Sequence, residues 1–164
     1  MQIEFRRLTE VAADDLIELF NDPDVRRHLP LATGRFTADT CARFVAAKER
    51  MWADHGYGPW AFFADGEFAG WGGLQPEGPD ADFGLVLHPR HWGLGPTLAR
   101  TILERAFGEM GHPSVIVLLP PSRTRIRALS RMGFEEDGEA VVGGERFVRY
   151  RRWNPATRRP ASGA

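Results

Sequence analysis

The chain of 164 residues is 43% hydrophobic and 26% charged, with a formal net charge of −1. This length is enough for one sizeable core, and the near-neutral charge excludes the broad basic field that attracts nucleic acid or an anionic membrane. Cys41 is the only cysteine, which excludes an internal disulfide and is typical of a reducing compartment. The sequence shows no signal-peptide core and no apolar run long enough to span a bilayer, so we expect a cytoplasmic protein.

The first third of the chain predicts one strand and two helices. Residues 3–8 alternate between apolar and polar side chains, as a half-buried strand does. Thr9 is suited to cap the first helix, which ends before Pro23. Thr37 is suited to cap the second helix, which ends at Gly56. The side chains expected to face inward are Ala12, Leu16, Leu19 and Phe20 in the first helix, and Cys41, Phe44, Val45 and Trp52 in the second.

The middle of the chain predicts a β-hairpin and then a strand that leads toward a helix. The pair Asp65-Gly66 separates the apolar runs 60–64 and 68–74, which is a strong hairpin pattern. Residues 76–80 are expected to form a loop, and residues 82–87 the next strand.

The second half of the chain alternates between helices and strands. A helix is predicted over residues 94–110 from its amphipathic spacing, and Gly111 is suited to end it. Residues 115–119 are continuously apolar, which favours a strand covered on both faces. The remaining expected elements are a short helix over 122–132 and strands over 134–142 and 146–153.

The predicted order is β-α-α-β-β-β-α-β-α-β-β, an α/β (α+β) single-domain fold in which helices flank both faces of a mixed, mostly antiparallel central sheet. Only the unit from residue 82 to residue 119 has the pattern of a parallel crossover. The folded domain is expected to span residues 1–153. Residues 154–164 are polar and contain Pro and Arg, so we expect a disordered tail there.

A candidate anion site lies where the strand over 82–87 meets the following helix. Gly93 and Gly95 form a turn at the start of that helix, whose first N–H groups have no helical partner and carry partial positive charge. Glycine lets a phosphate approach such a backbone closely, and Pro96 suits a first helical turn. The same pattern also fits an ordinary helix start. A dinucleotide fingerprint would need a third glycine and a downstream acidic residue, and a P-loop would need Gly-Lys-Ser/Thr.

Several longer motifs make the pattern more specific. They are Asn21-Asp22-Pro23-Asp24-Val25, Asp82-Phe83-Gly84-Leu85-Val86-Leu87 with Pro89, Trp92-Gly93-Leu94-Gly95, and Arg131-Met132-Gly133-Phe134. Together they resemble motifs of the GNAT superfamily of acyltransferases, and within it the group related to ribosomal-protein N-terminal acetyltransferases. The resemblance covers residues 1–152.

The resemblance implies the GNAT fold and an acetyl-CoA-dependent N-acetyltransferase that needs no metal. The residues that would bind the CoA pyrophosphate are Trp92, Gly93, Leu94, Gly95, Pro96 and Thr97. Leu85, Val86 and Leu87 would pair their backbone with the pantetheine arm, and an N–H near Val86 or Leu87 would stabilise the oxyanion. The acceptor would be a primary amine, from a protein N-terminus or a small molecule. Because the amine attacks directly, Cys41 is not needed as a nucleophile.

Three residues depart from the family pattern. Thr97 stands where relatives usually have Gly or Ala, and Ser122 where they usually have an Asn that contacts the cofactor. Arg125 stands where many relatives have a Ser that can protonate the leaving thiolate. These departures keep open a second hypothesis, a GNAT-like acyl-CoA-binding protein with little or no transferase activity. A third hypothesis, an arginine-mediated nucleic-acid module, is disfavoured by the near-neutral charge.

The general base has two candidates. An alkyl amine has a pKa of about 10, so it must lose a proton before it attacks. Asp82 is the first candidate, acting through water at a strand position where relatives carry Glu; the alternative is a solvated carboxylate at a strand edge. His88 is the second, because imidazole titrates near neutrality; the alternative is a surface residue before a proline.

Other residues have less specific patterns. Arg123, Arg127 and Arg131 recur every fourth residue, either as an exposed helix face or as contacts with the CoA 3′-phosphate or an acidic acceptor. The aromatic residues expected in the core, or lining the acceptor cleft with residues 29–36, are Trp60, Phe62, Trp71 and Trp92. The expected partners are acetyl-CoA and an amine, without nucleic acid or membrane, and the aromatic-rich surface permits a homodimer.

Overall fold

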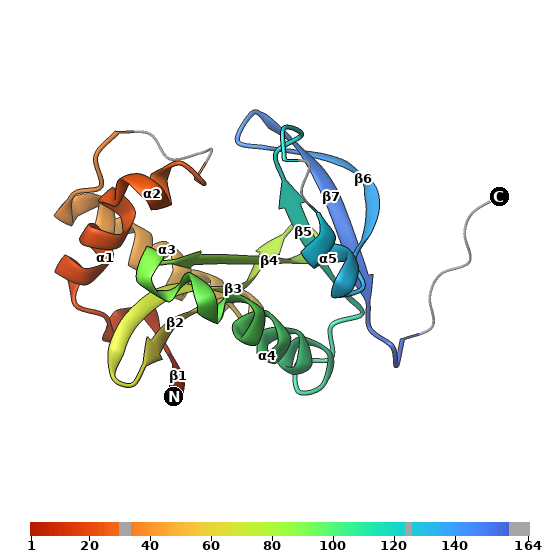
Figure 1. Cartoon of the computed structure of the whole chain (residues 1–164), viewed down its shortest axis with the longest axis horizontal. Helices are drawn as coiled ribbons and strands as arrows, with labels where there is room; N and C mark the ends of the chain where they lie inside the picture. Colours follow the sequence, from red (N-terminus) through yellow and green to blue (C-terminus); the bar gives the residue numbers. More distant parts are fainter. Residues whose placement is uncertain (30–33, 124–125, 158–164) are drawn as a thin grey trace.

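The residues described by the computed structural model, 1–29, 34–123 and 126–157, form a seven-stranded sheet in the order β1-β2-β3-β4-β5-β7-β6 (Figure 1). Neighbouring strands are antiparallel except β4 and β5, which are parallel. The fold is therefore the mixed, mostly antiparallel α/β sheet that the sequence predicts. The parallel crossover also lies where it is expected, between residues 82 and 119.

The N-terminal elements are β1 (Ile3–Arg6), the 3₁₀ turn η1 (Leu8–Glu10), α1 (Ala13–Asn21), α2 (Pro23–Arg26) and α3 (Ala38–His55). Thr37 caps α3 as predicted, because its hydroxyl oxygen accepts the N–H of Thr40. Gly56 ends the same helix with a φ of 75°, a left-handed conformation that glycine adopts without strain.

The predicted cap of α1 at Thr9 is wrong. Thr9 lies inside η1, where the Glu10 carboxylate accepts a main-chain N–H and the side chain of Leu8 is buried. Burial of Leu8 and this local hydrogen bond hold the chain in a 3₁₀ turn. Helix α1 therefore begins only after Ala12, which is exposed instead of lying on the inner face.

Three strands form an antiparallel meander: β2 (Pro59–Ala64), β3 (Glu67–Glu77) and β4 (Asp80–Leu87). The first turn falls at Asp65-Gly66, as predicted. The predicted loop over residues 76–80 is wrong, because β3 and β4 remain paired as far as Glu77 and Asp80. Pro76 is tolerated in β3 because β2 pairs only as far as Gly73, so no neighbour on that side needs the missing N–H.

The remaining elements are η2 (Pro89–Leu94), α4 (Gly95–Phe107), β5 (Ser114–Leu119), α5 (Arg127–Arg131), β6 (Glu135–Val142) and β7 (Glu145–Trp153). Helix α4 is shorter than the predicted 94–110: the 3₁₀ turn η2 takes residue 94, and the helix ends at Phe107 because Gly108 leaves the helical conformation. Helix α5 is also shorter than predicted, since the N–H of Arg123 bonds the carbonyl of Pro120 in a separate turn.

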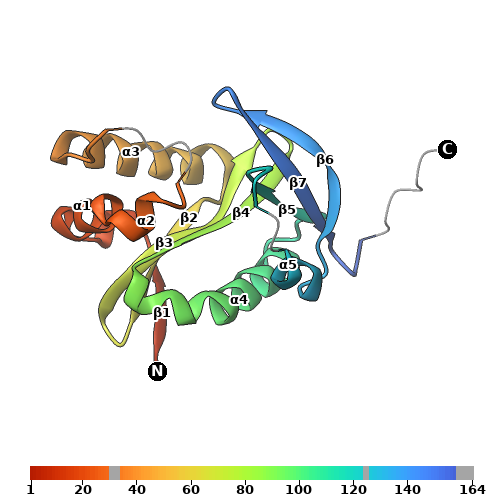
Figure 2. The same ribbon diagram turned by 45° about the horizontal axis from the view of Figure 1, so that its top comes forward.

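Two apolar cores cover opposite faces of the sheet, one beneath α4 and one beneath α1 and α3 (Figure 2). The first contains Trp60, Phe62, Leu98, Ile102 and Leu103; the second contains Leu16, Leu19, Cys41 and Trp71. Ala81 and Leu87 of β4 belong to the first core, whereas Val86 packs against the second. Because side chains alternate along a strand, Asp82 and Gly84 face the same side as Val86, toward α1 and α3.

The described chain remains packed beyond the last strand. Asn154 is 6% exposed, and its side-chain amide donates to the carbonyls of Phe107 and His112 at 3.2 and 3.0 Å. The expectation that the disordered tail begins at Asn154 is therefore wrong at this residue, because those bonds hold it against the end of α4. Residues 158–164 of the predicted tail lie outside the described residues.

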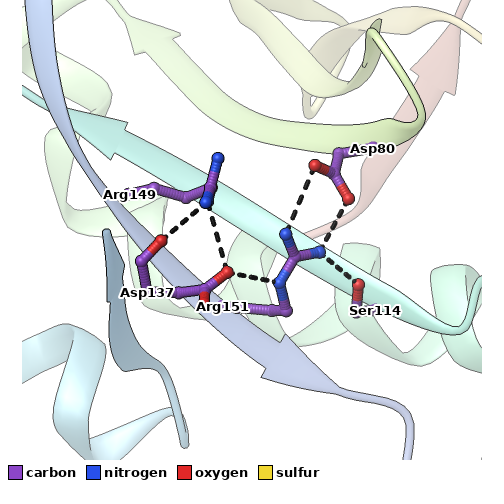
Figure 3. A network of polar contacts seen from close by, with 5 residues as sticks. All are labelled: Asp80, Ser114, Asp137, Arg149 and Arg151. Atoms are coloured by element: carbon purple, nitrogen blue, oxygen red, sulfur yellow. Dashed lines mark hydrogen bonds and ion pairs between the residues drawn. The ribbon is translucent and has the colours of Figure 1, made fainter. Parts of the chain in front are cut away.

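An ion-pair cluster ties β4 to the C-terminal strands (Figure 3). Arg151 of β7 donates to Asp80 at 2.7 Å, to Ser114 at 2.8 Å and to Asp137 at 2.7 Å, and its side chain is 14% exposed. The hydrogen bond from Arg151 lowers the pKa of Asp137. The cluster joins the first residues of β4 and β5, so it fixes these two parallel strands together at one end.

Candidate functional site

The strands β4 and β5 are paired at one end and separated at the other. Among the described residues, the one register pair between them is Asp82 with Ile116. The N–H of His88 donates to Ala69 of β3 at 2.9 Å, and the main-chain groups of a strand point alternately to its two sides. Leu85 and Leu87 therefore direct their main-chain groups away from β3, to the side where β5 has separated.

The orientation of Val86 supports the same alternation. A Cβ added to Gly70 of β3 would collide with the carbonyl oxygen of Val86, so that oxygen faces β3. The indole N–H of Trp92 donates to the carbonyl of Leu87 at 2.9 Å, from the opposite side. The sequence suggests the N–H of Val86 or of Leu87 as the oxyanion donor. The N–H of Leu87 faces the gap between β4 and β5, whereas the N–H of Val86 faces β3.

A pocket of about 330 Å³ lies beside this separated part of β4. Its lining is Val25, His28, Leu29, Leu85, Val86, Leu87, Trp92, Gly95 and Arg123. The strand residues nominated from sequence therefore meet the turn before α4 in one pocket. The described residues that the sequence nominates and that do not line it are Asp82, His88, Gly93, Leu94, Pro96, Thr97 and Ser122.

Two residues of this pocket were missed from sequence. Val25 and His28 reach it from α2 and the turn after it, and the ring of His28 meets Trp92 edge-to-face at 5.9 Å between centroids. Trp92 itself is 47% exposed, so of the two places that the sequence left open for it, the core is wrong and the pocket holds it. Its indole bond to Leu87 holds it at the pocket instead.

The start of α4 is open to solvent and free of side-chain crowding. A Cβ added to Gly93 or Gly95 would meet no atom within 4 Å, and Pro96 occupies the first turn of the helix as predicted. Thr97 is exposed. The N–H of Gly95 already donates to the carbonyl of Trp92, because the 3₁₀ turn runs directly into the helix. That amide therefore has an internal partner, contrary to the expectation of an unpaired first turn.

The loop after β5 contributes one arginine to the pocket. Ser122 is exposed in the turn that ends at Arg123, and Arg123 lines the pocket. Arg125 lies outside the described residues. Arg131 lines a different hollow of about 520 Å³ between α4 and α5, together with Arg100 and Arg152. The arginine series therefore divides between two places instead of forming one face.

Asp82 lies in an environment that favours its protonated form. Its pKa is raised from 3.8 to about 7, mainly by burial and also by the charge of Glu77, against the opposing effect of the Lys48 ammonium. The Nζ of Lys48 donates to Gln75 Oε1 at 2.5 Å, and burial lowers the pKa of this lysine. A carboxyl group with a pKa near neutrality can accept a proton at physiological pH.

His88 is held by its neighbours. Its Nδ1 accepts the main-chain N–H of Arg90 at 3.4 Å, so it caps η2, and its Nε2 lies 3.9 Å from Glu18 Oε1. A ring nitrogen that already accepts a hydrogen bond is less available to accept a proton from a substrate. The hydrogen bond at Nδ1 therefore counts against His88 as the base.

A mixed sheet whose parallel strands separate beside an exposed helix start fits the GNAT fold that the sequence motifs imply. The sequence matches the family described as the Acetyltransferase (GNAT) domain over residues 2–135, more than half of the chain. The chain therefore belongs to the GNAT acetyltransferase family. Its assignment to the ribosomal-protein group within that family stays a prediction.

Solved structures confirm the fold. An acetyltransferase of the GNAT family from Bacillus anthracis has a TM-score of 0.71 at 18% identity, covering 94% of this chain and 96% of that chain. A spermidine N-acetyltransferase from Vibrio cholerae, in complex with CoA and spermine, has a TM-score of 0.73 at 16% identity, covering 93% and 96%. At these identities the likeness shows the fold alone.

A curated relative matches a shorter stretch. The FsC-acetyl coenzyme A-N(2)-transacetylase of Aspergillus fumigatus is 37% identical over 73 residues, which is 37% of this chain and 31% of that protein. The match thus spans about a third of the relative's length. Within the described residues, no helix is long and apolar enough to cross a bilayer, and no group of three or more His, Cys, Asp or Glu is placed to hold a metal ion.

Proposed function

We propose that this chain is an acetyl-CoA-dependent N-acetyltransferase that moves an acetyl group to a primary amine by direct attack. The observation that carries the proposal is the pocket beside β4. There the main-chain groups of Leu85 and Leu87 face the gap left by β5, and the same pocket reaches Trp92 and Gly95 at the start of α4. An extended amide-bearing arm fits the strand, and an anionic group fits the helix start.

The chain's own residues divide the work of binding. Leu85 and Leu87 would pair with the pantetheine arm, with the N–H of Leu87 as the oxyanion donor. The residues that would hold the pyrophosphate are Trp92, Gly93, Leu94, Gly95, Pro96 and Thr97. Of these, Trp92 and Gly95 share the pocket with Arg123. Acetyl-CoA supplies an activated acetyl group on a thiol that leaves as thiolate. Ser122 and Arg125 stay candidate cofactor contacts, and Ser122 is exposed enough to reach a ligand.

Removal of the amine proton falls to Asp82. Its pKa of about 7 is matched to a base that works near neutral pH. It lies on the same face of β4 as Val86, four residues away, which is about 13 Å along an extended strand. At this separation the carboxylate does not touch an amine beside Val86, so the proposed transfer needs a chain of water molecules between them.

The acceptor is a protein N-terminus or a small-molecule amine. The spermidine N-acetyltransferase among the similar structures acts on a polyamine, so spermidine and short peptides with free N-termini belong in the test panel. The cytoplasmic location expected from the sequence stays a proposal. A homodimer stays a proposal.

One observation favours the alternative of an acyl-CoA-binding protein with little turnover. The amide of Gly95 is already bonded to Trp92, which leaves one donor fewer for a bound anion. The test is release of free thiol from acetyl-CoA with the amine panel, run beside calorimetric titration of acetyl-CoA. Thiol release that depends on an amine supports the transferase. Saturable binding with no thiol release for any amine supports the binding protein.

A further inference from the structure

The surface of β4 is bare between Asp82 and Val86. Both side chains face α1 and α3, and the residue between them on that face is Gly84. Gly84 is exposed, and a Cβ added to it would meet no atom within 4 Å. Its partner across the sheet is Gly73, so no side chain arises from either strand at this level. A Cβ added to Gly73 would meet the ring of Trp60 at 2.5 Å, so the open space lies over Gly84.

The backbone does not explain a glycine at position 84. Gly72 on the neighbouring strand has a φ of 149°, and a Cβ there would collide with the carbonyl oxygen of Gly84, so Gly72 is required by geometry. Gly84 has no left-handed φ and no close neighbour. A β-branched residue would suit an extended strand better than glycine does. What the structure gains from Gly84 is therefore empty space above the strand.

Lys48 borders this empty space. Its ammonium lies 5.4 Å from the ring centroids of both Trp71 and Phe44, and it donates to Gln75 at 2.5 Å. Trp71 and Gln75 are the β3 residues that flank Gly73 on the same face, so the lysine side chain spans the β3 half of the strip. Gln75 pairs in register with Asp82, which places the ammonium beside that carboxyl group.

We propose that the bare strip over Gly84 is the path by which the acceptor amine reaches the acetyl group and passes its proton toward Asp82, with Lys48 as a positioning residue along its edge. The inference rests on the proposed transferase function. The amine nitrogen forms the C–N bond, the C–S bond breaks, and the sulfur keeps the electron pair. The amine proton crosses the strip through water to the Asp82 carboxylate, whose charge the Lys48 ammonium balances.

The strip also makes a specificity prediction for the acceptor. Any side chain at position 84 projects into the space that the amine or its relaying water must occupy, while the amides of Leu85 and Leu87 still face the opposite edge of β4. Substitution of Gly84 should therefore separate acceptor use from acetyl-CoA binding. A merely structural role would move both together, along with stability.

The experiment compares Gly84→Ala and Gly84→Val with Glu139→Val, which places the same side chain on an exposed position of the edge strand β6. We expect Gly84→Val to lower kcat/KM for the amine by about 100-fold, as misplacement of a reacting group does. Gly84→Ala should lower kcat/KM by a smaller factor, and Glu139→Val should leave it unchanged. The affinity for acetyl-CoA by calorimetry should stay at the wild-type value in all three. The melting temperature should not fall in the two Gly84 variants, because either side chain suits an extended strand better than glycine does.

Lys48 is tested by its effect on the pH profile. Lys48→Met should shift the midpoint of kcat/KM against pH, and Lys48→Arg should restore it, at unchanged acetyl-CoA affinity. If the wild type acetylates an amine and Gly84→Val keeps the wild-type kcat/KM, the proposed acceptor path over Gly84 is wrong and the proposed transferase function is unaffected. An unmoved midpoint in Lys48→Met overturns the role of the lysine. A wild type that binds acetyl-CoA and acetylates no amine overturns the proposed function, and this inference with it.

Discussion

Replacing Asp82 by asparagine keeps the shape of the side chain and removes its ability to ionise. In the folded protein burial raises the pKa of Asp82 from 3.8 to about 7. At 1.36 kcal/mol per pKa unit, this difference corresponds to at most about 4 kcal/mol of unfolding free energy. The asparagine variant should be free of this cost.

The sign of the effect follows from the raised pKa. A group whose folded pKa lies above its unfolded value favours folding below the unfolded value, and this contribution is lost as pH rises through the folded value. Wild-type stability should therefore fall between pH 4 and pH 8 by an amount that Asp82→Asn does not show. Urea unfolding of both proteins across this range measures the difference directly, because the other titrating groups are common to both.

The same variant tests the catalytic role. Loss of a general base lowers the rate by about 10²- to 10⁴-fold, so kcat for amine acetylation should fall by that amount while acetyl-CoA still binds. Parallel pH dependence of unfolding in the two proteins would refute the burial of the charge. Wild-type kcat in Asp82→Asn would refute its role as base, whatever the stability data show.

Four further substitutions test electrostatics. The charges that face Asp82 are those of Lys48 from α3, Glu77 from β3 and Asp80 from its own strand, beside the phenol of Tyr57. The charge of Asp80 is neutralised by its ion pair with Arg151. Lys48→Met should move the midpoint of kcat/KM against pH to a higher pH, and Glu77→Gln should move it to a lower pH. Both variants are measured with the same acceptor, so that the ionisation of the amine cancels. Shifts of both midpoints in the same direction would contradict the causes assigned to the pKa of Asp82. Arg151→Ala should lower the unfolding free energy by about 3 kcal/mol, because it leaves the largely buried carboxylate of Asp80 without its ion-pair partner. Arg146→Ala, which breaks an exposed pair with Glu139, should cost below about 0.5 kcal/mol by the same urea titration, and equal losses would count against the cluster as a clamp.

Local signals predicted the fold well where one residue decides the backbone. Thr37 as a cap, Gly56 as a helix end and Asp65-Gly66 as a hairpin turn all lie where the sequence places them. The prediction that Thr9 caps α1 was wrong because burial of Leu8 decides the local conformation, and a short stretch of sequence does not show which residue is buried. The loop predicted around Pro76 failed for a similar reason, since the absence of a neighbouring strand is a property of the whole sheet.

The candidate site was also predicted only in part from local sequence patterns. Leu85, Leu87 and the turn at Gly95 are close in sequence, and the order strand, glycine turn, helix brings them together. His28 comes from another part of the chain, and its neighbours give no signal for it. Lys48 could have been found, because it falls on the stripe of Cys41, Phe44, Val45 and Trp52, where a charged residue interrupts an apolar helix face.

The most direct test of the account is residue-resolved hydrogen exchange of the β4 amides with and without acetyl-CoA, by NMR on this 18.4 kDa chain. The N–H groups of Leu85 and Leu87 face the gap beside β5, whereas that of Val86 is turned toward β3. Saturating acetyl-CoA should slow exchange at Leu85 and Leu87 and leave Val86 as it was. Saturable binding with unchanged exchange at both leucines would contradict the placement of the acyl donor along this strand.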